Sequence, residues 1–140
     1  MHLQTHFDVA CARDSAVAIA ARDETLVGLF PDSKTRIVER AGQRKTTETH
    51  YTKLGRSGTA TFHFTYRSDG DIEFEKECDG AVWQELRGTL SFRERAGRTR
   101  VAIEMRGRTK AFVPEFTVKG AMQDQLEQMA DALRERLQAG

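Results

Sequence analysis

The sequence predicts an α+β protein in which a curved antiparallel sheet of about seven strands surrounds a long C-terminal helix. Three observations predict it. Residues 34–108 alternate polar and apolar side chains and reach a turn signal about every ten residues, as in an antiparallel meander. Residues 114–138 have helical spacing with one apolar stripe. One strand and two short helical segments precede the meander.

The first predicted strand covers residues 6–12, whose side chains alternate between two faces. Helical spacing follows, and either Asp14 or Ser15 can serve as the N-cap of a helix. Asp23 can cap a second short helix. Pro31 ends that helix, because its ring cannot continue the hydrogen-bond ladder.

Six strands are predicted for the meander, at residues 35–41, 45–54, 59–67, 71–78, 82–93 and 98–108. The turns between them contain glycine, which reaches positive φ without strain. A three-residue loop at Ser68-Asp69-Gly70 predicts one hairpin register. The apolar face of that hairpin then carries the opposed pairs Phe62–Lys76, Phe64–Phe74 and Tyr66–Ile72.

Two neighbouring registers depend on loop length. A three-residue loop at Asp79-Gly80 puts Glu73 opposite Arg87 on the solvent side, a complementary charge pair. At Gly55, a four-residue loop turns Tyr51 inward and a five-residue loop turns His50 inward. The sequence leaves this second alternative open.

The predicted C-terminal helix is about 37 Å long, enough to cross a small sheet. Its apolar stripe comprises Val118, Met122, Leu126, Met129, Leu133 and Leu137. Pro114 suits the first turn, where its missing donor costs nothing. Gly120 makes the helix about 1 kcal/mol less stable than alanine would at that position. It either leaves space for a ligand and for movement of the helix, or allows a close approach between helix and strand.

This order of elements resembles the helix-grip (SRPBCC) superfamily of START domains, Bet v 1 type allergens and bacterial polyketide cyclase/dehydrase-like proteins. The resemblance covers nearly all of residues 1–140, read as one domain. It is carried by the first strand, Leu29-Phe30-Pro31-Asp32, the Gly88 strand, Gly97-Arg98-Thr99-Arg100-Val101 and the last helix. The turn at 29–31 is also similar to that of carbon monoxide dehydrogenase G-subunit-like proteins. The resemblance implies a cavity between sheet and helix that holds a hydrophobic or amphipathic small molecule.

The predicted ligand-binding residues are Phe62, Phe64, Tyr66, Ile72, Phe74, Lys76 and Met105 from the sheet, with Phe112, Phe116 and Met122 entering from the helix side. The alternative is that these apolar side chains are simply a packed core. Lys76 is the one charge on the apolar face, so it either extends to the rim or anchors a polar ligand group. Glu48, His50 or Tyr51 can add another polar group.

Composition and motifs exclude several other classes. With 22 basic and 21 acidic residues, the net charge of +1 predicts neither a nucleic-acid partner nor stable membrane insertion. The histidines lack metal-ligand spacing, and no cofactor motif is found. We interpret the basic residues of the last strand, Arg98, Arg100, Arg106, Arg108 and Lys110, as a solvated face neutralised by nearby acids. Cys11 and Cys78 are expected to be free thiols in a cytoplasmic protein without a signal peptide.

Three functions remain as hypotheses. The first is non-enzymatic binding of a lipid-, polyketide- or isoprenoid-like molecule. The second is a cyclase- or dehydratase-like enzyme in the same cavity, with acid or base candidates Lys76, Glu48, His50 and Tyr66. The third is an accessory domain for a partner enzyme, or a homodimer, which would use an exposed apolar patch near Leu26 and Phe30.

Overall fold

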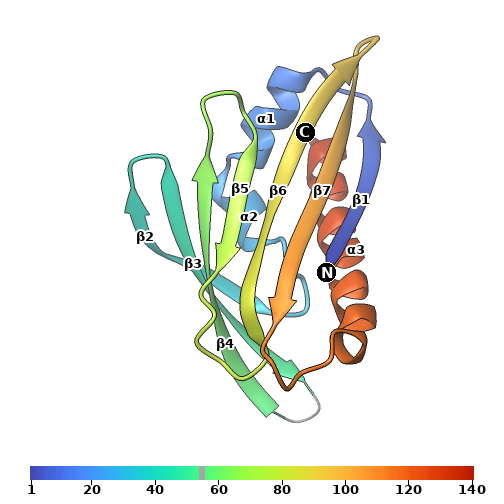
Figure 1. The fold of residues 1–140 in the computed structure, drawn as a ribbon. Coiled ribbons are helices and arrows are strands. Elements are labelled where there is room, and N and C mark those ends of the chain that lie inside the picture. The colour runs from blue at the N-terminus through green and yellow to red at the C-terminus, as the bar shows by residue number, and fades with distance from the viewer. Residues whose placement is uncertain (54–55) are drawn as a thin grey trace.

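A computed structural model describes residues 1–53 and 56–140 (Figure 1). The elements are β1 (His2–Val9), α1 (Arg13–Ala20), α2 (Asp23–Val27), β2 (Lys34–Ala41), β3 (Arg44–Lys53), β4 (Arg56–Tyr66), β5 (Ile72–Lys76), β6 (Trp83–Arg95), β7 (Arg98–Thr109) and α3 (Phe116–Ala139). The strands form one antiparallel sheet in the order β1-β7-β6-β5-β4-β3-β2. The predicted fold class is therefore confirmed.

The helices contact different strands on the concave face of the sheet. The long helix α3 packs mainly against β1 and also contacts β7 and α1, whereas α2 packs against β2 (Figure 1). Among the described helices, none is long and apolar enough to span a bilayer. The concave face thus has one region under α3 and another under α2.

The predicted register of the β4–β5 hairpin is confirmed. Phe64 lies opposite Phe74, and Gly70 in the turn has φ of +95°. The prediction that Glu73 lies opposite Arg87 is wrong, because Glu75 occupies that position. The reason is a longer connection, since β5 ends at Lys76 and β6 begins only at residue 83. A shift of two residues keeps every side chain on its predicted face.

The predicted helix starts are wrong because tertiary contacts replace local caps. The N-cap of α1 is Ala12, and Glu94 Oε1 from β6 accepts the Arg13 backbone N–H at 2.7 Å. Asp23 lies inside α2, where its carboxylate instead binds Arg40 and Lys45. α2 ends at Val27, before Pro31, and Pro114 precedes the first turn of α3. The first strand also begins earlier than predicted and ends at Val9.

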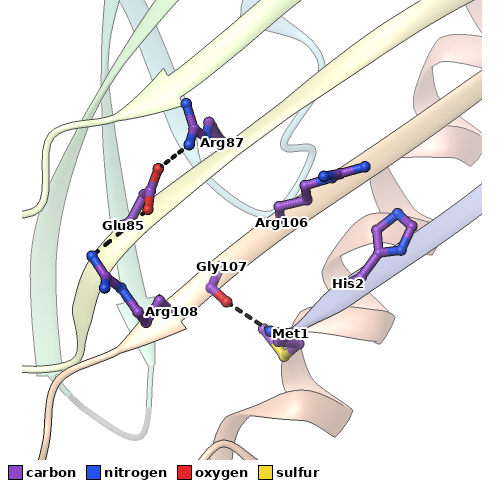
Figure 2. Close-up of a pocket in the computed structure, with 7 residues that line it drawn as sticks. All are labelled: Met1, His2, Glu85, Arg87, Arg106, Gly107 and Arg108. Atoms are coloured by element: carbon purple, nitrogen blue, oxygen red, sulfur yellow. Dashed lines mark hydrogen bonds and ion pairs between the residues drawn. The ribbon is translucent and has the colours of Figure 1, made fainter.

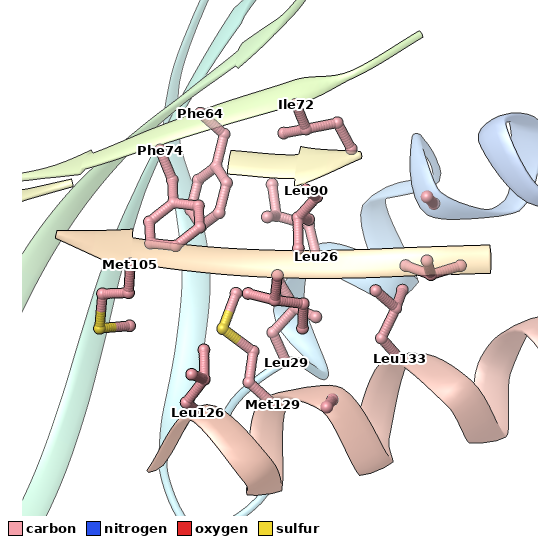
Figure 3. Packing of buried hydrophobic residues seen from close by; sticks show 14 of the residues in the cluster. Leu26, Leu29, Phe64, Ile72, Phe74, Leu90, Met105, Leu126, Met129 and Leu133 are labelled. Carbon is pink, nitrogen blue, oxygen red and sulfur yellow. The ribbon is translucent and has the colours of Figure 1, made fainter. Parts of the chain in front are cut away.

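The apolar stripe of α3 forms one wall of the core, as predicted. Its residues Met122, Leu126, Met129, Leu133 and Leu137 are buried, and Val118 is half-buried. Figure 3 shows Leu126, Met129 and Leu133 facing the sheet. A Cβ at Gly88 would clash with the Phe74 ring and the Glu104 carbonyl. Glycine is therefore required at position 88, where the Phe74 ring of β5 lies across β6.

Candidate functional site

A row of aromatic rings lines the inner face of β4 and β5. Phe30 stacks on Phe62 with ring centroids 5.5 Å apart, Phe62 is 6.2 Å from Phe64, and Phe64 is 6.1 Å from Phe74. The rings of the strands are buried, and Figure 3 shows Phe64 and Phe74 on the side of the sheet that faces the α2 and α3 residues. The predicted inward orientation of this row is confirmed. Ile72, Met105 and Met122 are also buried in the same core cluster.

A row of polar side chains on β3 lies beside the aromatic row. Because the register pairs Thr47 with Phe62 and Thr49 with Ala60, both threonines share the concave face with the rings. Thr47 is 0% exposed. The hydroxyl of Thr49 is also buried and lies 2.9 Å from that of Thr35 on β2. This row of hydroxyls was not predicted, because threonine gives no hydropathy contrast in the sequence.

Two hydroxyls on the concave face are buried and have no hydrogen-bond partner among the described residues. They are Thr47 Oγ1 and the Tyr66 hydroxyl. A buried hydroxyl without a partner costs about 1–3 kcal/mol. A hydroxyl both donates and accepts a hydrogen bond, so each can bind an oxygen or nitrogen atom of a small molecule.

Charged groups surround Tyr66 at one end of the polar row. Lys45 Nζ lies 4.7 Å from the centre of the Tyr66 ring and donates to Asp23 Oδ1 at 2.8 Å. Hydrogen bonds from Arg40 and Lys45 hold the pKa of Asp23 well below its usual range. Burial, with a smaller contribution from Asp23, raises the pKa of Tyr66 to about 12. Tyr66 is therefore a neutral hydroxyl at physiological pH, able to donate a hydrogen bond.

Lys76 lies at the rim of the concave face, as the snorkelling alternative predicts. Its side chain is half-buried, and Nζ donates to the Glu77 carbonyl at 3.3 Å. The register turns Tyr51 inward and His50 outward, which decides between the two alternatives. Tyr51 lies across Gly58. The loop itself, at residues 54–55, lies outside the described residues.

Two predicted cavity residues are at the surface instead. Phe112 is 99% exposed and Phe116 is 82% exposed, which corrects the expectation that they enter the interior. Phe112 lies in a loop closed by a hydrogen bond from Val113 N–H to the Lys110 carbonyl. Phe116 comes six residues before Met122, a spacing that places it off the apolar stripe of α3.

Several other expectations are also corrected. Gly120 is exposed, and a Cβ there would meet nothing within 4 Å, so it serves no close approach between helix and strand. Leu26 is 3% exposed and Phe30 stacks on Phe62, so the predicted apolar patch for a partner enzyme is not exposed. His50 binds Glu48 on the outer face, which removes both from the interior acid and base candidates.

Both cysteines are free, as predicted.

Comparison with known proteins supports the fold. No protein-family model matches the chain, and no curated protein matches it either. Solved structures do match. A START superfamily protein from Mycobacterium smegmatis has a TM-score of 0.76 at 18% identity, with 99% of this chain and 97% of that chain covered. The Zhui aromatase/cyclase from Streptomyces sp. R1128 has a TM-score of 0.77 at 15% identity, with coverages of 99% and 92%.

A STAR-related lipid transfer protein from Xanthomonas axonopodis has a TM-score of 0.67 at 15% identity and coverages of 97% and 85%. The chain has a START/Bet v 1-like helix-grip fold. In this fold the seven strands form one curved sheet, and α3 packs on its concave face against β1 and β7. Since α3 contacts β1 and β7 and α2 contacts β2, the rows on β3, β4 and β5 lie between the strands that the two helices contact.

Proposed function

We propose that this protein binds an amphipathic small molecule of lipid-, polyketide- or isoprenoid-like chemistry within the helix grip. The observation that carries the proposal is the pair of buried hydroxyls, Thr47 and Tyr66, which have no partner among the described residues. They lie on the same face as the aromatic row. A ligand oxygen beside either hydroxyl would supply the missing hydrogen bond and remove its desolvation cost.

The apolar part of the ligand would contact the aromatic row. The rings are already buried in the protein, so the gain would come from the ligand's own apolar surface, which contributes about 25 cal/mol per Å² when it leaves water. The proposed contact residues are Phe62, Phe64, Tyr66, Ile72, Phe74, Met105 and Met122. Lys76 at the rim would pair with an anionic or carbonyl end of the ligand.

The solved relatives support this class of ligand. One with the same fold is named a lipid transfer protein, and another is named an aromatase/cyclase. The first name refers to a lipid, a molecule with a large apolar part, and the second refers to an activity that closes rings. A ligand of that kind matches a face that combines aromatic rings with hydroxyls.

Native mass spectrometry of the protein purified from its own host tests the proposal. We expect a small molecule that remains bound in the native spectrum and is released by organic solvent. The same preparation is then titrated with 1,8-anilinonaphthalene sulfonate, an amphipathic fluorescent probe. Phe64→Ala should weaken probe binding, whereas Phe112→Ala, which removes an exposed ring, should not. Unchanged probe affinity in Phe64→Ala would exclude the aromatic row as the binding surface.

An enzyme of the cyclase class acting on the concave face is the second candidate, favoured by the Tyr66 hydroxyl, which has no partner among the described residues. Because its pKa is raised, the Tyr66 phenol stays neutral and is suited to donate a hydrogen bond, rather than a proton, to a ligand carbonyl. Lys76, at the rim, is the other candidate. Turnover of a bound polyketide-like substrate that disappears in Tyr66→Phe would support this function. Unchanged turnover in both Tyr66→Phe and Lys76→Met would contradict it.

A further inference from the structure

Two phenylalanine rings at the start of the last helix are left uncovered by the rest of the molecule. Phe112 is 99% exposed and Phe116 is 82% exposed. The next most exposed large apolar side chains among the described residues are Val38 and Tyr51, at 44% and 38%. Phe112 lies on the connection from β7 to α3, and Phe116 is the first residue of α3 (Figure 1). Scattered apolar side chains are normal on a surface, but neighbouring exposed rings indicate an interaction site. We call Phe112 and Phe116 the exposed ring pair.

The backbone around the exposed ring pair is fixed by hydrogen bonds on both sides. The Lys110 N–H donates to the Val82 carbonyl at 2.8 Å, which joins this connection to the one between β5 and β6. The Met1 amine donates to the Gly107 carbonyl at 2.9 Å, as Figure 2 shows, and to Glu115 Oε1 at 3.2 Å. The rings therefore project from an ordered segment, and their exposure is a feature of the fold.

The charges around the exposed ring pair nearly cancel. Both signs are present at this end of the molecule, namely Arg108, Lys110, Lys119 and the Met1 amine against Asp79, Glu85 and Glu115. Glu115 is itself paired with the Met1 amine, and Glu85 lies 3.9 Å from Arg108 (Figure 2). A strongly charged partner such as a nucleic acid is therefore not favoured, and the rings must drive any contact.

The size of the exposed ring pair separates two kinds of partner. A phenylalanine side chain buries about 150–250 Å² at a contact, so two rings offer about 300–500 Å². A stable protein interface takes about 800 Å² from each partner, and the other exposed apolar side chains, Val38 and Tyr51, lie on β2 and β3. A second protein would therefore bury mainly polar surface here. The boundary between the headgroups and acyl chains of a bilayer, in contrast, accepts a few aromatic rings next to polar side chains.

We propose that this end of the molecule makes a shallow, reversible contact with the surface of a phospholipid bilayer. The exposed ring pair would enter the boundary between headgroups and acyl chains, and the exposed Lys119 would extend toward the lipid phosphates. The contact needs no helix that spans the bilayer, and among the described helices none is long and apolar enough to do so. It does not depend on the proposed ligand site either, because neither ring lies in the interior.

Flotation of the full chain with vesicles of phosphatidylcholine tests the proposal. We expect half of the protein to bind at on the order of 1 mM accessible lipid, an affinity that the burial of two rings can supply. Phe112→Ala and Phe116→Ala should each weaken binding at least about 10-fold, and the double variant should show the larger loss. Val38→Ala is the matched control. It removes an exposed apolar side chain on β2, away from the exposed ring pair, and should leave vesicle binding unchanged.

Three results would overturn the proposal: no binding up to about 10 mM lipid, undiminished binding by the double variant, or an equal loss in Val38→Ala. A concentration-dependent dimer without lipid that the double variant lacks would also overturn it, by assigning the rings to a second copy of the chain. Because exposed side chains contribute little to stability, the double variant should keep the midpoint of thermal unfolding, so lost binding is not lost folding. It should also bind anilinonaphthalene sulfonate normally, which separates this surface from the proposed ligand site.

Discussion

The two halves of the concave face belong to one sheet but differ in chemistry. Beneath α3 and α1, the inner residues of β6 and β7 are mainly aliphatic, and Val101 and Ile103 are both 0% exposed. Thr99 is buried there too, but its hydroxyl donates to the Cys11 carbonyl at 2.7 Å. We call this the aliphatic half. Beneath α2, the inner residues of β3 include buried threonines, and β4 contributes Tyr66. We call this the hydroxyl half.

The difference follows from what covers each half. α3 has 24 residues and presents a continuous apolar stripe, so the strands beneath it are packed with apolar side chains. α2 has five residues and contacts β2. In this half the hydroxyls of Thr47 and Tyr66 are buried without a described partner, which lowers the free energy of unfolding. A ligand that formed hydrogen bonds with them would offset that loss. Both halves belong to one core cluster, but the buried hydroxyls without a described partner lie in the hydroxyl half.

The largest expected effect comes from truncating the aliphatic half. Leu126 on α3 is 0% exposed, and Leu126→Ala should lower the free energy of unfolding by about 2–5 kcal/mol through lost burial and a cavity. Chemical denaturation measures the change. Gln128→Ala, on the exposed side of the same helix, should change stability by less than about 0.5 kcal/mol. A small effect at Leu126 would mean that α3 does not carry the fold.

The next effect lies where the two halves meet. Gly88→Ala should destabilise the protein by about 1–3 kcal/mol, because the new methyl group would overlap the Phe74 ring and a neighbouring carbonyl. Gly80→Ala is the control, since a Cβ there meets nothing within 4 Å. Thermal unfolding of the two variants compares them. Equal stability would show that the ring can move away from β6.

Neighbouring threonines should respond in opposite directions. Thr47→Val removes a buried hydroxyl without a described partner and should raise the free energy of unfolding by about 1 kcal/mol. Thr46 faces outward, where its Oγ1 lies 2.8 Å from His63 Nδ1, and Thr46→Val should lower that free energy by about 1 kcal/mol. Urea denaturation of ligand-free protein measures both. Destabilisation by Thr47→Val would show that its hydroxyl is already satisfied.

At neutral pH, Tyr66→Phe should raise the free energy of unfolding by about 1 kcal/mol, as Thr47→Val does, because it also removes a buried hydroxyl without a described partner. The Tyr66 pKa of about 12 exceeds the ordinary value of 10, so the folded state holds its proton more tightly than the unfolded state does. This contribution to stability is complete below pH 10 and is lost as pH rises toward 12. Tyrosinate absorbance should show a late titration from Tyr66. In Tyr66→Phe the late titration should be absent, and its persistence would show that Tyr66 is not its source.

Much of the architecture could be predicted because regular patterns encode it locally. Alternation indicated the strands of the meander, the Ser68-Asp69-Gly70 turn indicated the β4–β5 register, and spacing indicated the stripe of α3. Local sequence could not show that Glu94 would cap α1 or that Asp23 would bind Arg40, because both partners are distant in the chain.

The candidate site was predicted in its apolar part and at Tyr66 and Lys76, but not on β3. Aromatic residues at alternate positions identified the row on β4 and β5. Thr47 gave no signal, because its inward orientation depends on the pairing of β3 with β4. Phe112 and Phe116 were misplaced because an apolar side chain was assumed to be buried. Hydrophobicity indicates what can be buried, whereas the backbone path decides what is.

The pairing of β1 with β7 has a consequence for how the molecule is made. Strand β1 is synthesised early, yet its only neighbour in the sheet begins at Arg98, and α3, which packs on it, comes later still. On the ribosome, β1 must therefore remain without its hydrogen-bonding partner until most of the chain has emerged. Contacts so distant in sequence slow folding, so we expect the pairing of β1 with β7 to be a late event in folding.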